Sequence, residues 1–448
     1  MSEMGRFPDD FVFGVATAAY QIEGAVGEGG RIASHWDTFS HTSGHTYRGE
    51  TGDVACDYYH RYRDDVALLR ELGVSSYRFS FAWPRILDEG GQVNSRGIDF
   101  YHRVIDELDQ AGVTPTATIY HWDLPQWIAN QGGWVNRDTV NYFVDYAQVL
   151  FREYGDRISR WITHNEPWCQ AFLGYGYGVH APGHANWDEA VKASHHLLLS
   201  HGQAVQAFRA LGQKGDVGIS LNLNVVDPAS HTDEDYGAAR RGDGFQNRWF
   251  LDPLFLGSYP ADIMDLFRPH MKDYRFIQPG DLDTIATPMD FLGINYYSRA
   301  VLKDAPQEGI LRTRGVLAPD APMTAMGWEV HPASLYRLLM RINRDYTQLP
   351  VYITENGAAY PDVVDHGGRV HDLDRVAFLK AHLKSALDAI SDGSTLQGYY
   401  LWSLMDNYEW AEGYSKRFGL IYVDFESQQR IWKDSAVWYR EFIQQQYR

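Results

Sequence analysis

Residues 160–167 read Arg160-Trp161-Ile162-Thr163-His164-Asn165-Glu166-Pro167. Mostly apolar or β-branched residues run into an Asn-Glu pair, and this composition predicts a buried β-strand. Proline cannot donate to a sheet ladder, so the strand ends before Pro167. The stretch therefore predicts that Glu166 is presented at the C-terminal lip of a buried strand.

A second stretch repeats this design. Val351-Tyr352-Ile353-Thr354 has a buried-strand pattern and runs into Glu355-Asn356-Gly357. In a barrel of parallel strands, the chemistry is carried out where the C-terminal strand ends meet. Two glutamates there would supply the neutral acid and the charged nucleophile or base that hydrolysis of a glycosidic bond requires. A lone strand-end glutamate is more often solvated or salt-bridged, so the prediction depends on the pair.

Short apolar runs alternate with helical patterns eight times along the chain. The predicted strands are residues 11–18, 76–83, 114–122, 160–166, 217–223, 291–297, 351–355 and 396–404. Eight β-then-α units predict an α/β fold, the (β/α)8 or TIM barrel, as a single domain over residues 1–448. Long loops follow several strands and would gather at the C-terminal face. A doubly wound sheet is the alternative, but no glycine-rich phosphate turn is seen at a strand–helix junction.

The composition limits the partners of the protein. Lys and Arg number 40 and Asp and Glu 58, which gives a net charge of −18 and argues against nucleic acid or an anionic membrane as partner. Aromatic residues make up 14% of the chain; they suit stacking on sugar rings, although most would fill the core.

The two cysteines, Cys56 and Cys169, form no disulfide framework and favour a reducing compartment. Because no signal-peptide pattern or membrane-length apolar run is seen, we expect a cytoplasmic protein.

Two of these stretches also carry a family resemblance. Residues 163–167 (Thr-His-Asn-Glu-Pro) and 353–357 (Ile-Thr-Glu-Asn-Gly) resemble the two catalytic signatures of glycoside hydrolase family 1, the β-glucosidase family. Residues 11–24 resemble the N-terminal signature of that family, and the similarity runs from about Phe7 to the C-terminal helix. The resemblance implies an exo-acting enzyme that releases terminal non-reducing β-D-glucosyl residues with retention. It implies β-galactosidase or β-fucosidase side activity, small substrates such as cellobiose or aryl glucosides, and no cofactor or metal; a homo-oligomer remains open.

The resemblance also assigns roles to individual residues. Glu355 would be the nucleophile and Glu166 the acid/base, with Arg78 and Tyr297 holding Glu355 ionised while Glu166 retains its proton. The implied substrate-binding residues are Gln21, His121, Trp122, Asn165, Asn295, Tyr297, Trp328, Trp402, Glu409 and Trp410. Glu409 would also disfavour 6-phosphosugars by charge repulsion. Trp168 and Phe172 are expected at the entrance. His164, where the family often has an apolar or aromatic residue, could lie behind Glu166 and shift its pKa or point into the barrel wall, and we favour the second.

Structural explanations stay open for several of these residues. Arg78 could form an ion pair inside the barrel, His121 could be a satisfied strand-end residue, Asn165 could cap a turn, and Glu409 could be an ordinary loop carboxylate. At the level of function, the alternatives are a sugar-binding barrel without turnover and a metal-dependent hydrolase. The presence of both glutamates argues against the first, and the lack of an H-E-x-x-H motif or Cys/His cluster argues against the second.

Overall fold

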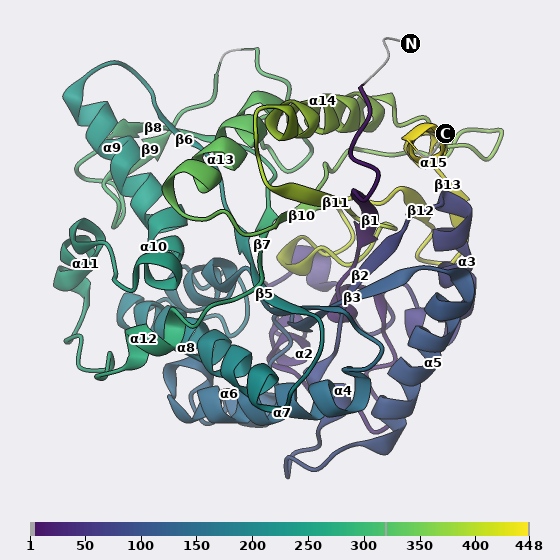
Figure 1. The fold of residues 1–448 in the computed structure, drawn as a ribbon, viewed down its shortest axis with the longest axis horizontal. Coiled ribbons are helices and arrows are strands. Elements are labelled where there is room, and N and C mark those ends of the chain that lie inside the picture. Colours follow the sequence, from purple (N-terminus) through teal and green to yellow (C-terminus); the bar gives the residue numbers. More distant parts are fainter. Residues whose placement is uncertain (1–4, 319, 447–448) are drawn as a thin grey trace.

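The computed structural model describes residues 5–318 and 320–446, in which eight parallel strands close into a barrel surrounded by helices (Figure 1). The barrel strands, in order around the ring, are β1 (Val12–Ala16), β2 (Ser76–Ser80), β3 (Thr114–Tyr120), β4 (Arg160–Asn165), β5 (Asp216–Asn222), β7 (Phe291–Asn295), β10 (Val351–Asn356) and β11 (Leu396–Trp402). Strand β11 pairs in parallel with β1 and closes the ring. Each strand coincides with one predicted run, so the predicted TIM barrel is confirmed.

Long helices follow the strands and cover the outside of the barrel. They are α3 (Tyr58–Leu72), α5 (Ser95–Ala111), α7 (Asp138–Tyr154), α8 (Trp187–Ala210), α9 (Asp233–Asp243), α10 (Trp249–Leu256), α13 (Pro332–Asp345), α14 (Leu373–Ser391) and α15 (Asp434–Gln446). In α5, Ile98, Tyr101, Ile105 and Leu108 recur at helical spacing and are buried. The helix stops at Gly112, whose left-handed φ of 71° glycine adopts without strain.

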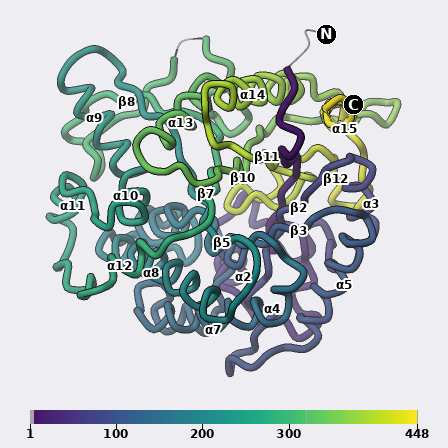
Figure 2. Tube along the Cα trace, in the orientation of Figure 1, coloured from purple at the N-terminus to yellow at the C-terminus, as the bar shows by residue number. Residues whose placement is uncertain are grey.

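Shorter elements lie in the loops between these units. The short helices are α1 (Ala19–Ile22), α2 (His35–Ser40), α4 (Trp83–Ile86), α6 (Gln126–Ala129), α11 (Ala261–Phe267) and α12 (Asp281–Ile285). A three-stranded sheet joins β6 (Val226–Pro228), β8 (Ala300–Asp304) and β9 (Thr313–Gly315), and a hairpin pairs β12 (Ile421–Val423) with β13 (Arg430–Trp432). Both additions follow barrel strands, so they lie in the loops that wall the C-terminal face; β8 lies beside α9 in the tube view (Figure 2).

Side chains fill the inside of the barrel. Arg160 on β4 donates to the hydroxyls of Tyr352 on β10 and Tyr400 on β11, at 2.8 and 3.3 Å. Neither strand neighbours β4 in the ring, so these contacts cross the interior. Ile162 and Phe291 belong to the same buried cluster. The interior is therefore a packed core, and space for a ligand is left only toward the strand ends.

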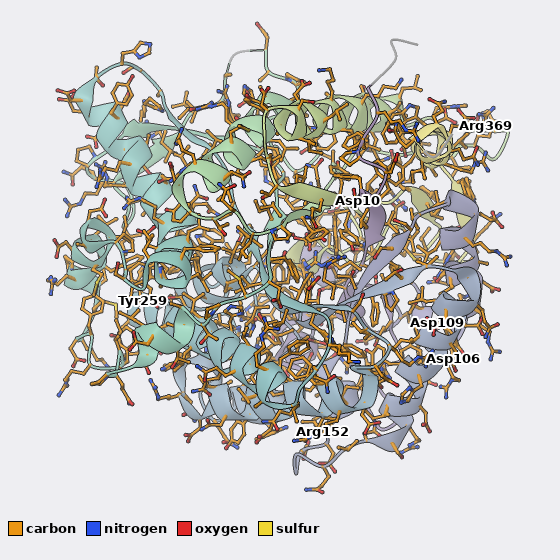
Figure 3. The ribbon with its side chains drawn as sticks, viewed as in Figure 1. Asp10, Asp106, Asp109, Arg152, Tyr259 and Arg369 are labelled. Atoms are coloured by element: carbon orange, nitrogen blue, oxygen red, sulfur yellow. The ribbon has the colours of Figure 1, made fainter. Side chains whose placement is uncertain are left out.

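Charged side chains mark the outer surface of the helical ring. Asp106 and Asp109 on α5 and Arg152 on α7 lie at its edge (Figure 3), and Arg157 pairs with both aspartates at 2.8 and 2.5 Å. The two described ends of the chain lie near one another, since Phe7 packs edge-on against Phe442 of α15 (Figure 1). Over residues 5–318 and 320–446, no helix has both the length and the apolarity needed to cross a membrane.

Candidate active site

A cavity of about 740 Å³ opens where the barrel strands end, and both predicted glutamates line it. Around them lie all of the predicted binding residues: Gln21, His121, Trp122, Asn165, Asn295, Tyr297, Trp328, Trp402, Glu409 and Trp410. Most of them come from the last residues of a strand or from the turn that follows it. The barrel thus brings together side chains that are almost 400 positions apart in the sequence.

Glu355, on β10, is buried and lies between a cation and a hydroxyl. The Nη1 atom of Arg78 donates to its Oε1 at 2.7 Å, and the Tyr297 hydroxyl donates to its Oε2 at 2.6 Å. Arg78 reaches across the barrel from β2, and its own side chain is 1% exposed. Burial raises the pKa of Glu355 above its ordinary value, while Arg78 and then Tyr297 act in the opposite direction. The predicted partners are in place, but the pKa of Glu355 is still raised overall, so burial outweighs the effect of Arg78 and Tyr297.

Glu166 has a different set of neighbours. Its backbone lies in the left-handed region, with φ of 47°, and its N–H donates to the carbonyl of Ser220 at 2.8 Å. Its Oε1 accepts from the amide of Asn295 at 2.8 Å, and its Oε2 accepts from the thiol of Cys169 at 3.1 Å. Burial, followed by the negative charge of Glu355, raises the pKa of Glu166 to about 8. Both effects favour the protonated form of Glu166.

A chain of side-chain amides connects the two glutamates. The amide of Asn295 donates to Glu166 and also to Oδ1 of Asn165, at 2.8 and 2.9 Å. The same Asn165 oxygen accepts from Nη2 of Arg78 at 2.6 Å, and Arg78 in turn binds Glu355. Every side chain in this chain of contacts is buried. The positions of the two carboxylates are therefore fixed relative to one another by rigid, hydrogen-bonded groups.

Polar atoms without a protein partner point to a ligand site beside Glu355. Gln21 donates to Asn407, Tyr408 and Glu409, but its Oε1 is buried and has no hydrogen bond. Nε2 of His121 lies 3.0 Å from the amide of Asn165, whereas its Nδ1 has no partner. Buried polar atoms normally have partners, so these atoms are available to the hydroxyl groups of a ligand. Burial, then the charges of Glu355 and Glu166, raises the pKa of Glu409 to about 8.

Aromatic rings form the walls of the cavity. Trp410 packs against Trp122 with ring centroids 4.6 Å apart, and Trp402 faces His121 at 6.0 Å. Trp328 lies on another side, against Tyr297 at 5.3 Å. Ring faces of this kind can stack on the apolar face of a pyranose.

Of the further positions around the cavity, two were predicted at its entrance and two were not predicted. Trp168 lines the cavity as expected, but Phe172 does not: it is fully buried against Phe245 because the segment winds into a π-helix, η3 (Cys169–Gly176). Cys169 and Asn222 line the cavity and were missed. Asn222 ends β5, so the strand-end reasoning that found Glu166 would have found it too.

His164 points into the wall between β4 and the surrounding helices, the favoured one of its two predicted orientations. It is buried, stacks on Phe143 at 4.3 Å and bonds to the hydroxyl of Ser200 at 2.8 Å. Among the described residues, no group of three or more His, Cys, Asp or Glu side chains has an arrangement that could hold a metal ion.

A TIM barrel with two buried, hydrogen-bonded glutamates in an aromatic-walled cavity defines the class of the protein, a glycoside hydrolase. The chain belongs to glycosyl hydrolase family 1, whose sequence model matches residues 3–447. It is 48% identical to β-glucosidase A of Thermotoga maritima, over 98% of each chain. It is also 48% identical to a bifunctional β-D-glucosidase/β-D-fucosidase of Bifidobacterium breve, again over 98% of each. The crystal structure of the family 1 β-glucosidase from Exiguobacterium antarcticum B7 superposes with a TM-score of 0.97 at 48% identity, covering 99% of both chains.

Proposed function

We propose that the protein is a retaining, exo-acting β-glycosidase that removes terminal non-reducing β-D-glucosyl residues from small β-glucosides, such as cellobiose or aryl glucosides. The observation that carries this proposal is the contrast between the two glutamates. Glu355 accepts hydrogen bonds from a guanidinium and a phenol, whereas Glu166 accepts only from a neutral amide and a thiol. One carboxylate is thereby suited to be a nucleophile and the other to be an acid.

In the first step, a carboxylate oxygen of Glu355 attacks the anomeric carbon while the bond from that carbon to the aglycone oxygen breaks. Glu166 gives its proton to the departing oxygen, so the aglycone leaves as a neutral alcohol. The product is a glycosyl ester on Glu355. A pKa of about 8 for Glu166 supports this role, because the proton is present at neutral pH.

In the second step, Glu166 is a carboxylate and acts as a base. It takes a proton from a water molecule, whose oxygen attacks the anomeric carbon and displaces Glu355. Two inversions give net retention, and Glu166 regains its proton for the next turnover. Asn165 would position the 2-hydroxyl, and Asn295 would position Glu166. Such contacts accelerate the reaction most when they tighten at the transition state.

Recognition of the sugar is assigned to the unpartnered polar atoms and to Glu409. Gln21, His121 and Glu409 would bind hydroxyls of the non-reducing glucosyl unit, Trp402 and Trp410 would pack against its ring, and Trp328 would support the aglycone. A buried carboxylate at position 409 favours an unphosphorylated sugar. The names of the relatives support glucosides as substrates, with fucosides as a second class.

Three broader predictions belong to this proposal. Residues 1–448 would form one catalytic domain, the protein would be cytoplasmic, and homo-oligomers would be compatible with activity. The proposal uses no cofactor.

The test removes the nucleophile. We expect Glu355→Ala to lose turnover by a factor of at least about 10⁴, since no ester can form. Added azide or formate should restore part of the activity with activated aryl glucosides and give a product of inverted configuration, read by proton NMR. The wild-type enzyme should first release the β-anomer of glucose. Release of the α-anomer by the wild type would contradict the retaining mechanism, and full activity of Glu355→Ala would contradict the assignment of the nucleophile.

A further inference from the structure

The thiol of Cys169 directly contacts the side chain to which we assign the proton transfer. Cys169 is three residues after Glu166, and its N–H donates to the Glu166 carbonyl at 2.9 Å. This turn directs the sulfur toward the glutamate, where Sγ lies 3.1 Å from Oε2. Cys169 is 7% exposed and lines the active-site cavity. It therefore belongs to the site, although the proposed mechanism gives it no task.

The surrounding contacts determine the direction of the thiol hydrogen bond. The amide of Asn222 donates to the same sulfur at 3.6 Å, so the sulfur is an acceptor on that side. The S–H bond is then free to donate to Glu166, whose other oxygen is occupied by Asn295. A thiol is a weak donor and a weak acceptor. Such a group can bind a carboxylate without competing strongly for the proton of the acid form.

We propose that Cys169 is a positioning residue for Glu166, holding its carboxylate through an S–H hydrogen bond in the half of the reaction in which Glu166 acts as a base. The inference rests on the proposed role of Glu166. During the second step Glu166 is anionic and must be aimed at the incoming water. Asn295 then donates to one oxygen of the carboxylate and Cys169 donates to the other, so both oxygens are restrained. The hydrogen bond from the thiol is stronger to the anion than to the neutral acid.

Charged groups on neighbouring elements also influence the pKa of Glu166. Glu355 on β10 raises the pKa of Glu166, and Arg78 on β2 lowers it. Glu409 and Tyr297 line the same cavity. Removal of Cys169 leaves these groups in place. Because a hydrogen bond to the charged form lowers the pKa of an acid, its loss should move the pKa of Glu166 further upward.

The first experiment measures kcat/KM against pH for the wild type and for four variants: Cys169→Val, Cys169→Ser, Cys56→Val and Glu166→Ala. Cys169→Val fills the position with a somewhat larger apolar side chain and removes the donor. We expect it to move the alkaline limb of the profile, where kcat/KM falls with rising pH, upward by about 0.5–1 pH unit. Cys169→Ser restores a donor and should return the limb to the wild-type position. The control is Cys56→Val: Cys56 is the other cysteine, is also buried, and donates instead to the Asp406 carbonyl at 3.1 Å. Its profile should match the wild type.

The outcomes separate this proposal from the function on which it rests. Suppose that Glu166→Ala abolishes the alkaline limb but that neither Cys169 variant moves it. The proposed role of Cys169 would then be wrong, while the proposed role of Glu166 would be supported. If Glu166→Ala leaves the limb unchanged, the assignment of the acid fails and the role of Cys169 falls with it.

A second measurement does not depend on how Cys169 variants fold. In Cys56→Ala only one thiol remains, so the S–H stretching band in the infrared spectrum reports Cys169 alone. We expect this band to move to lower frequency as the pH rises through the alkaline limb, because the thiol then donates to a carboxylate. Adding Glu166→Gln should abolish the pH dependence. A band that does not move across the limb would overturn the proposal.

Discussion

Glu166 and Glu355 have the same side chain, and the contacts of individual oxygen atoms make them different. Both are buried, so desolvation raises both pKa values. Only Glu355 has a guanidinium directly on one of its oxygens, at 2.7 Å. The positive charge is therefore bound to the glutamate that must be an anion at the start of the reaction. The proton stays on the other glutamate because two adjacent carboxylates resist being ionised together.

This contrast predicts the pH dependence of catalysis. Glu166 must begin the cycle protonated, and its pKa is about 8, so kcat/KM should be high below pH 8 and fall above it. Glu409 in the same cavity also has a pKa of about 8, so two groups contribute to this fall, and Glu166→Ala should remove the contribution of Glu166. The variant should retain far more activity on glucosides with good leaving groups, such as dinitrophenol, than on alkyl glucosides, since only poor leaving groups need the proton. Equal losses on both kinds of substrate would contradict the role of Glu166 as the acid.

Strand-end patterns predicted Glu166 and Glu355, but not their immediate partners. A glutamate after an apolar strand can be read from local sequence. The contact between Cys169 and Glu166 depends on the left-handed backbone of Glu166 and on the π-helix that follows it, and neither has a clear local pattern. Likewise, Asn165 and Asn295 were assigned by resemblance to sugar binding, whereas the structure shows that they also connect the glutamates to Arg78.

At the scale of elements, a buried ion cluster anchors the loop that follows β11. This loop carries Glu409, and its Asp406 binds Arg417 and Lys433, each at 2.7 Å. Lys433 is fully buried, lies just after β13, and also binds Asp362 in the loop after β10. Burial lowers the pKa of Lys433, and the two aspartates oppose that shift. The cluster therefore ties together two loops of the catalytic face.

Removal of the central cation tests this arrangement. Lys433→Met leaves Asp362 and Asp406 buried with less compensation, and we expect it to lower the free energy of unfolding by about 3–5 kcal/mol. KM should also rise, because Glu409 and Trp410 lose their support. The control is Lys384→Met, which breaks an exposed pair with Asp388 and should cost less than about 1 kcal/mol. Urea denaturation and initial rates measure the two effects; equal stability losses in the two variants would contradict the argument.

Sequence patterns predicted the elements of the barrel better than those of its loops. The eight barrel strands have five to seven residues each and are almost wholly buried, and most of them contain a short apolar run that is visible in the sequence. Strands β6, β9, β12 and β13 have only three residues each, and their residues are largely half-exposed. Such short strands lack a clear alternation, and a partner can be distant in the sequence, as for Val226 of β6 and Ala300 of β8. Strand β6 can pair only once the barrel has brought these two loops together, whereas β12 and β13 form a local hairpin.

On the scale of the whole molecule, the two ends of the barrel have different tasks. The cavity opens at the C-terminal strand ends, whereas the N-terminal end of β1 is sealed by phenylalanines from both ends of the chain. Phe13 and Phe442 meet edge-on at 5.5 Å, and Phe7 and Phe11 pack beside them with tilted rings at 4.6 Å. TIM barrels commonly separate stability from catalysis in this way, and the sealed end therefore predicts a stability role without a catalytic one.

Phe442→Ala tests both this separation and the prediction of a single domain. Phe442 is 5% exposed, so its loss should reduce the free energy of unfolding by about 3–5 kcal/mol, and KM should stay at the wild-type value because the cavity is untouched. The exposed Leu373, at 67%, is the control, since Leu373→Ala should change stability by less than about 0.5 kcal/mol.

If residues 1–448 are one cooperative domain, tryptophan fluorescence and residual activity must report the same urea midpoint in each protein. A variant that loses activity in an earlier transition than fluorescence would show that the catalytic face unfolds separately, and the single-domain prediction would then be wrong.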